Sequence, residues 1–207
     1  MKNPDCPHCD PASSFALSKV LEETKNFYIV CDVHPLIEGH ILIIPKKHIS
    51  CIGEFPEKLF QQFVRLSDKV TKFLLDNYGQ VSSFEHGKIG QTVFHAHMHL
   101  LPYGGRPENI IPENKFRAIQ KLSDLRTVFV QNKEYLFFSI GNNLWVVEPT
   151  VAFPGFFRQR FAQALKRGER GDWRRWRYHK TISCQANIEI KNLVDRWKAA
   201  MSALDNN

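Results

Sequence analysis

The chain has 207 residues, 43% of them hydrophobic, and a formal net charge of +7 at pH 7. This length and composition are typical of a globular protein that buries a sizeable core in one large or two small domains. No apolar run approaches the roughly 20 residues of a membrane span and the N-terminus has no secretory pattern, so we expect a cytoplasmic protein without a membrane partner.

The chain opens with Cys6-Pro-His-Cys9, in which two thiols are spaced so that one cation can bind both. A redox pair is the alternative interpretation of this spacing. The chain has five cysteines. Their odd number and uneven distribution fit a reduced compartment with a metal site better than a disulfide framework. A metal site of this kind needs two further ligands.

Residues 27–33 and 40–45 are rich in β-branched and aromatic side chains, which predicts two strands of a hairpin. From Pro56 to Asn77 apolar residues recur at helical spacing, and Gly79 follows as a stop signal. We therefore expect a long helix that serves packing. A short strand near 81–85 comes next.

His95, His97 and His99 alternate with the apolar residues Phe94, Ala96, Met98 and Leu100. This period of two predicts a strand that carries three imidazoles on one face and packs its other face on a core. Pro102 is expected to end the strand. Imidazoles supply nucleophilic or metal-binding nitrogens whose charge changes near neutral pH. The alternative is a half-exposed strand on which the histidines have no chemical role.

Two blocks of sequence carry a family resemblance. Residues 90–101 read Gly-Gln-Thr-Val-Phe-His-Ala-His-Met-His-Leu-Leu, and residues 32–49 contain Asp-Val-His-Pro and then Gly-His-Ile-Leu-Ile-Ile-Pro-Lys-Lys-His-Ile. Together they resemble the histidine triad (HIT) family of nucleotide hydrolases and transferases. The resemblance covers about residues 5–105. It implies an α+β fold, with a HIT-like antiparallel sheet and a long helix in a domain of residues 1–107.

The resemblance also implies a mechanism. His97 would attack the α-phosphorus of a purine nucleotide substrate, such as a dinucleoside polyphosphate or a nucleoside phosphoramidate, and form a nucleotidyl-histidine intermediate. His99 would assist as a second catalytic residue. The nucleotide-binding residues implied are Asp32 for the ribose, His40 near the phosphate, directly or through another residue, and Gly90, Gln91, Thr92 and His99 for the phosphate oxygens. A turn-starting role is the alternative for Asp32, and a nucleotide contact by Glu85 stays open.

Some family members have a structural zinc site, and the resemblance assigns Cys6, Cys9, His48 and His95 as its ligands here. His8 is an alternative ligand. Galactose-1-phosphate uridylyltransferases carry Gln at the position of His99, so the histidine favours the hydrolase-like branch over the sugar-transferring one.

The C-terminal half lies beyond the resemblance. We expect a linker over residues 108–126 and then, over 127–207, a smaller region of strands followed by helices. Strands are predicted at 127–131, 134–140 and 143–147, and helices at 156–167 and 187–204. This region could cover the surface that small family members bury as homodimers, which would make the chain a pseudo-dimer. A homodimer of this chain is the alternative.

Residues 166–180 interleave basic and aromatic side chains. RNA binding is one interpretation, because aromatic rings stack on bases and arginines contact phosphates. A solvated basic surface anchored by tryptophans is the other. The alternative function for the whole chain is accordingly a nucleotide- or RNA-binding module with little turnover.

Overall fold

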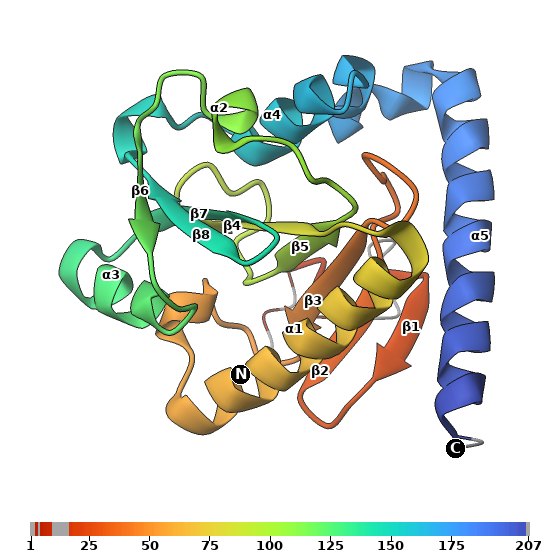
Figure 1. The fold of residues 1–207 in the computed structure, drawn as a ribbon, viewed down its shortest axis with the longest axis horizontal. Coiled ribbons are helices and arrows are strands. Elements are labelled where there is room, and N and C mark those ends of the chain that lie inside the picture. The colour runs from red at the N-terminus through yellow and green to blue at the C-terminus, as the bar shows by residue number, and fades with distance from the viewer. Residues whose placement is uncertain (1–2, 4, 10–16, 206–207) are drawn as a thin grey trace.

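The computed structural model describes residues 3, 5–9 and 17–205. Within them, one antiparallel sheet holds eight strands in the order β1-β2-β3-β5-β4-β7-β8-β6 (Figure 1). The strands are β1 (Val20–Glu23), β2 (Phe27–Cys31), β3 (Ile41–Pro45), β4 (Ser82–Gly87), β5 (Met98–Leu101), β6 (Phe116–Ile119), β7 (Tyr135–Ile140) and β8 (Asn143–Val147). The α-helices are α1 (Glu57–Tyr78), α2 (Pro107–Ile110), α3 (Asp124–Asn132), α4 (Phe156–Ala164) and α5 (Lys180–Asp205). The predicted α+β class with an antiparallel sheet and a long helix is confirmed.

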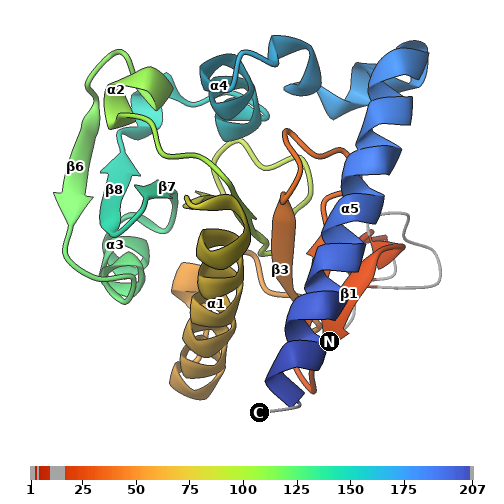
Figure 2. The ribbon, with the colours of Figure 1, turned by 45° about the vertical axis from the view of Figure 1, so that its right-hand side comes forward.

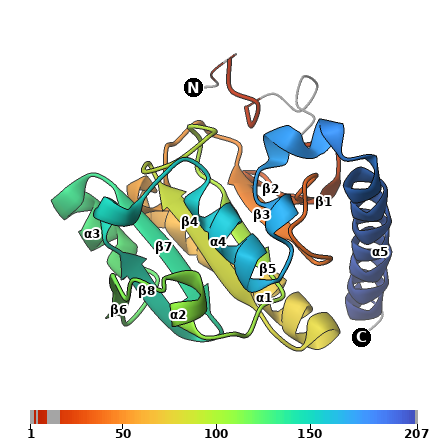
Figure 3. The ribbon, with the colours of Figure 1, turned by 90° about the horizontal axis from the view of Figure 1, so that it is seen from above.

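Different helices pack on the two faces of the sheet. Alternate residues of β7 belong to different apolar clusters, with Phe137 in the cluster of α1 and α5 and Phe138 in the cluster of α4. Helix α5 runs beside α1 (Figure 2), and α4 lies across the other face (Figure 3). In β5, Leu100 joins the α1 cluster and Leu101 the α4 cluster. His99 therefore points to the α4 face, as alternation along a strand requires.

The long helix and its stop signal are confirmed. Helix α1 begins after Pro56, which has an extended backbone, and ends at Tyr78, before Gly79 with a φ of 74°. Glycine adopts this left-handed conformation without the strain a side chain would add. The predicted hairpin is also confirmed, because β2 and β3 pair antiparallel over five residues each.

The triad strand begins later than predicted. Strand β5 starts at Met98, so His95 and His97 lie in the segment before it. The backbone there bonds elsewhere: the His95 N–H donates to the Val93 carbonyl, and the next N–H along donates to the Ile49 carbonyl. The apolar alternation holds for Ala96, Met98 and Leu100, which are buried, but Phe94 is 70% exposed. The strand ends before Pro102, as predicted.

The predicted strand at residues 127–131 is wrong, because these residues lie in α3. Leu125 and Val128 are buried on one side of this helix, while Val130 is 65% exposed. Burial at a spacing of three thus prevails over the preference of β-branched residues for strands.

The segment expected as a linker, 108–126, contains most of α2, all of β6 and the start of α3. The predicted strands 134–140 and 143–147 correspond to β7 and β8, and α5 begins seven residues before the predicted 187. Strand β7 pairs with β4 from Ser82 to Gly87. The C-terminal region therefore extends the sheet of the N-terminal half, while the division into domains at 107 and 127 stays a prediction. None of the described helices is long and apolar enough to cross a bilayer.

Candidate functional site

A cavity of about 270 Å³ opens on the α4 face of the sheet. Five of the residues predicted for the site line it: Asp32, Gly90, Thr92, His97 and His99. The N-terminal loop contributes Pro7 and His8, and the C-terminal region contributes Gly155, Arg158 and Trp173. The cavity is therefore built from segments that span most of the chain.

His97 has its proton placed by the main chain. Its Nδ1 lies 2.6 Å from the carbonyl oxygen of His95, which can only accept a hydrogen bond. Nδ1 therefore carries the proton, and Nε2 of the neutral ring keeps its lone pair. Burial lowers the pKa of His97 below its ordinary value, which favours this neutral form.

His99 is oriented by a chain of hydrogen bonds. The Leu36 N–H donates to Nδ1 of His40 at 3.1 Å, so His40 must carry its proton on Nε2. That nitrogen lies 2.9 Å from Nδ1 of His99, which therefore accepts. Neutral His99 thus carries its own proton on Nε2. Burial, followed by the neighbouring histidines, lowers the pKa of His99 well below its ordinary value and keeps the ring neutral.

The cavity thus presents two imidazoles in opposite tautomers. His97 offers a bare Nε2 and His99 a protonated one, with the ring centroids 4.9 Å apart. A lone pair beside an N–H donor suits attack on a phosphoryl centre whose oxygens need hydrogen bonds. His40 itself is fully buried and does not line the cavity; its Nε2 is hydrogen-bonded to His99.

Asp32 is held by a residue that the sequence did not point to. Its Oδ2 accepts from Nη1 of Arg158 at 2.6 Å, and its Oδ1 accepts from the His34 N–H at 2.8 Å. Burial alone would raise the pKa of Asp32, but Arg158 and then His40 outweigh it and lower the pKa to about 2. The carboxylate is therefore ionised and fixed in orientation. Arg158 also donates to the His34 carbonyl at 2.6 Å.

Asp32, His40 and His99 bring their ligand atoms within 4.8 Å of one another. A metal ion would need a free lone pair from each of these residues. Nε2 of His40 carries a proton instead, and Oδ2 of Asp32 is already paired with the Arg158 guanidinium. His40 donates to His99, and the Asp32 carboxylate lies 3.5 Å from Nε2 of His40 and 3.7 Å from Nδ1 of His99.

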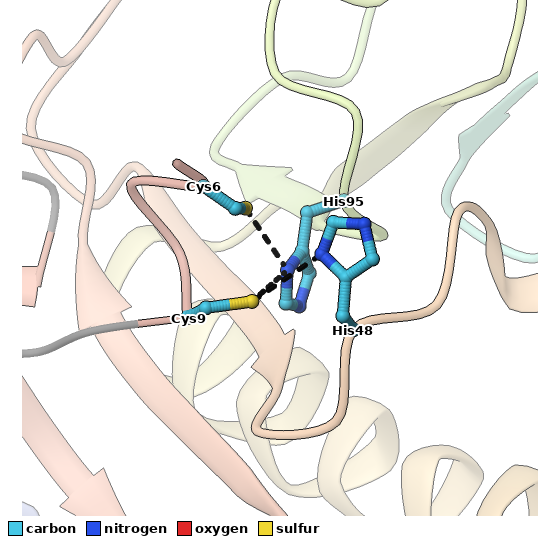
Figure 4. A group of neighbouring side chains, drawn as sticks. All are labelled: Cys6, Cys9, His48 and His95. Atoms are coloured by element: carbon cyan, nitrogen blue, oxygen red, sulfur yellow. Dashed lines mark hydrogen bonds between the residues drawn. The ribbon is translucent and has the colours of Figure 1, made fainter. Parts of the chain in front are cut away.

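A second cluster lies beside the cavity. Cys6, Cys9, His48 and His95 bring four ligand atoms within 4.8 Å of one another (Figure 4). Nδ1 of His95 lies 3.4 Å from Sγ of Cys6 and 3.5 Å from Sγ of Cys9, and Nδ1 of His48 lies 3.3 Å from Sγ of Cys9. The cluster brings together the four predicted metal ligands. His8 is not part of it; its ring packs against His97 with centroids 5.0 Å apart.

The side chains of Gln91, a predicted site residue, and of Glu85, whose nucleotide contact was left open, both contact the protein outside the cavity. The side-chain amide of Gln91 donates to the Ser50 carbonyl and does not line the cavity. Glu85 is fully buried, and accepts from the Ile52 N–H and from the hydroxyl of Tyr135. Glu85 does not line the cavity either, so the open question of its nucleotide contact is answered against one.

Four arginines of the basic segment 166–180 pair with carboxylates. Arg167 and Arg170 both bind Glu189 of α5, and Arg174 and Arg175 both bind Asp172. Trp176 is buried and Arg170 is 1% exposed. This arrangement favours the interpretation as an anchored surface over RNA binding.

Comparisons with known proteins agree with the motifs. The HIT domain model matches residues 16–105. A curated relative, the "Protein hit" of Bacillus subtilis, is 28% identical over 106 residues, which cover 49% of this chain and 73% of the relative. An adenosine 5'-monophosphoramidase of Saccharomyces cerevisiae is 35% identical, with 47% of this chain and 61% of the relative covered. One of Candida albicans is 30% identical, with 47% and 69% covered.

Solved structures with similarity to this chain include a HIT family member from Bacillus subtilis, with a TM-score of 0.44, 24% identity, and 61% of this chain and 94% of that chain covered. A zinc-bound histidine triad family protein from Mycobacterium smegmatis has a TM-score of 0.41 and 22% identity, with 62% and 96% covered.

Proposed function

Because the chain belongs to the HIT domain family, we propose that it is a nucleotide hydrolase or nucleotidyltransferase that acts at an α-phosphate through a nucleotidyl-histidine on His97. Two of its relatives are named adenosine 5'-monophosphoramidase, which supports a HIT-type nucleotide hydrolase. The proposed substrates are dinucleoside polyphosphates and nucleoside phosphoramidates with a purine base.

The observation that carries the proposal is the hydrogen bond from Nδ1 of His97 to the His95 carbonyl. It leaves the Nε2 lone pair free to attack the α-phosphorus. A bond from Nε2 to phosphorus forms as the bond from phosphorus to the leaving oxygen or nitrogen breaks. Water then attacks the same phosphorus, the P–N bond breaks, and the nucleoside monophosphate leaves with a new oxygen.

We assign the phosphate oxygens to the protonated Nε2 of His99, to Thr92 and to the backbone N–H groups near Gly90 and Gln91. The Thr92 side chain is exposed at the cavity, and Gly90 has a φ of 70°. A Cβ at Gly90 would lie 2.7 Å from the Phe153 carbonyl oxygen, so only glycine fits there without a shift. Donors placed in advance around developing negative charge stabilise a transition state.

We assign the ribose hydroxyls to Asp32. A carboxylate has about four acceptor positions. Two of them are used by Arg158 and the His34 N–H, which leaves capacity for hydroxyl donors.

We propose that Cys6, Cys9, His48 and His95 hold a structural zinc ion. Zinc bonds of about 2.3 Å to sulfur and about 2.0 Å to nitrogen separate tetrahedral sulfur and nitrogen ligands by about 3.5 Å. The sulfur–nitrogen distances of 3.3–3.5 Å in the cluster fit that value. Nε2 of His95 lies 2.7 Å from the Pro45 carbonyl, so Nδ1 keeps the lone pair that faces the thiols. When bound, the ion would fix the N-terminal loop to the sheet.

Product analysis in ¹⁸O-labelled water tests the proposal. The protein is mixed with diadenosine tetraphosphate and, separately, with adenosine 5'-phosphoramidate, beside the variants His97→Ala and His179→Ala. His179 is exposed and does not line the cavity, which makes it a matched control. We expect AMP that carries the label in wild type and in His179→Ala, and none in His97→Ala. Label in the other product, or turnover that survives His97→Ala, contradicts the mechanism.

A further inference from the structure

We propose that Trp173, in the C-terminal region, is the residue on which the nucleobase of the substrate stacks. This makes the C-terminal region part of the active site and selects a phosphate ester that carries an aromatic base. The inference rests on the proposed function and adds a specificity-determining residue to it.

The position of Trp173 comes first. It lines the same cavity as His97 and His99. Its ring packs on that of His34 with centroids 5.5 Å apart and planes 33° apart. His34 is two residues from Asp32, to which we assign the ribose. Since the base is bonded to the ribose, an aromatic ring on the Asp32 side lies where the base must go.

The exposure of Trp173 is the second observation. Among the tryptophans of the described residues, Trp173 is the one that lines the cavity. Trp176 and Trp197 are buried at 3% and 2% exposure, and Trp145 stacks on Phe138. Trp173 is only partly buried.

The remaining walls suit a flat apolar ring. Pro7, Val33 and Leu42 line the same cavity. An aromatic side chain stacks on any base, because every base has a π face. We therefore expect Trp173 to distinguish nucleotides from simple sugar phosphates rather than one base from another.

The segment that carries Trp173 is held in place before any ligand arrives. Nη1 of Arg170 donates to the Pro35 carbonyl at 3.0 Å and binds Glu189 of α5 at 2.5 Å. Arg158 donates to the carbonyl of His34, the residue on which the Trp173 ring packs. Anchoring the segment in this way reduces the conformational freedom that is lost when Trp173 stacks on a base.

Two ligands and three variants of the full chain test the inference. AMP and ribose 5-phosphate share the sugar and the phosphate, and differ by the base. Their dissociation constants are measured by calorimetry for wild type, Trp173→Ala, Trp173→Phe and the control Trp145→Phe. AMP is a product of the proposed reaction, so turnover does not disturb the measurement.

We expect Trp173→Ala to raise the dissociation constant of AMP about tenfold. The dissociation constant of ribose 5-phosphate should stay within about twofold of wild type. Trp173→Phe keeps an aromatic face and should retain AMP binding within about threefold. AMP should quench the tryptophan fluorescence of wild type and of Trp145→Phe, and the quenching should disappear in Trp173→Phe.

Equal weakening of both ligands by Trp173→Ala, or no weakening of either, would overturn the inference and leave the proposed function standing. Quenching that persists in Trp173→Phe would also count against it. Wild type that binds neither ligand would overturn the proposed function and this inference together.

Discussion

Each histidine of the triad has one ring nitrogen hydrogen-bonded to a neighbour, so only the other ring nitrogen is free to bind a ligand or to react. His95 commits Nε2 to the Pro45 carbonyl, and His97 commits Nδ1 to the His95 carbonyl. His99 commits Nδ1 to His40. Three identical side chains at a spacing of two thus differ in which ring nitrogen is free and whether it carries a proton, because their backbone and side-chain partners differ.

Arg158 should be far more important for stability than its neighbour on α4, Arg160. Arg158→Leu leaves the buried carboxylate of Asp32 without its cation, and losing one partner of a buried pair costs about 3–5 kcal/mol. Arg160 pairs with Glu113 nearer the surface, where such pairs contribute about 0–1 kcal/mol, so Arg160→Leu is the control. Urea denaturation at pH 7 measures both. Equal losses of unfolding free energy in the two variants would show that the Asp32–Arg158 pair contributes no more to stability than the pair nearer the surface.

The same pair predicts an acid dependence. The pKa of Asp32 is about 2 in the folded chain and 3.8 for the unperturbed group. A lowered pKa stabilises the fold above pH 3.8, and this contribution is lost as the pH falls through 2. In Asp32→Asn the change in unfolding free energy between pH 5 and pH 2 should be smaller than in wild type. An unchanged slope would contradict the assigned pairing.

Glu85 predicts the opposite pH dependence. Burial raises its pKa to about 8, from 4.5 for the unperturbed group, despite the hydrogen bonds from Tyr135 and the Ile52 N–H. The protonated form fits the core, so the contribution is complete below pH 4.5 and is lost as the pH rises through 8. Cys51 and Tyr135, which also face Glu85, keep raised pKa values and stay neutral over this range.

The measurement compares wild type with Glu85→Gln. Between pH 5 and pH 8 the free energy of unfolding of wild type, relative to the variant, should fall by up to about 1.4 kcal/mol per pH unit. A constant difference across that range would contradict a neutral buried Glu85.

At the scale of elements, the sequence was most informative where local pattern and burial agree. The hairpin of β2 and β3, helix α1 and the pair β7 and β8 follow from their periodicity. Helix α3 was not predicted, because its run of β-branched residues favours a strand, while its buried residues have helical spacing. The segment before β5 was also missed, since its hydrogen bonds go to the Val93, Ile49 and Ser50 carbonyls, which periodicity does not reveal.

The proposed zinc site would fix residues 5–9 to the sheet. We expect one zinc ion per chain by elemental analysis, lost in Cys9→Ser and kept in Cys184→Ser, whose cysteine is exposed and outside the cluster. Since metal binding contributes directly to folding free energy, loss of zinc should lower the melting temperature by several degrees. Retention of zinc by Cys9→Ser would contradict the assigned ligands.

At the scale of the molecule, the cavity could be predicted only in part. The motifs identify Asp32, Gly90, Thr92, His97 and His99, all of which line it. Arg158 lies 126 residues from Asp32 in the chain, and neither it nor Trp173 belongs to a motif that links it to the triad. Contacts of that range depend on the path of the whole sheet, which no local pattern encodes.

The C-terminal half also predicts an oligomeric state. Strand β7 pairs with β4 along its length, so β4 has both neighbours filled within the chain. An edge that is already paired cannot add a strand from another copy. We expect a monomer of 24.1 kDa by light scattering. A stable dimer through β4 would contradict the pseudo-dimer interpretation.

The most direct test of the account is the covalent intermediate on His97. The protein is mixed with diadenosine tetraphosphate in single turnover, quenched under alkaline conditions that preserve phosphoramidates, and examined by intact and peptide mass spectrometry. We predict an adenylyl group on His97 that forms at the rate of ATP release, decays at the rate of AMP release, and is absent in His97→Ala. AMP release without an adduct, or an adduct on another residue, would contradict the central claim.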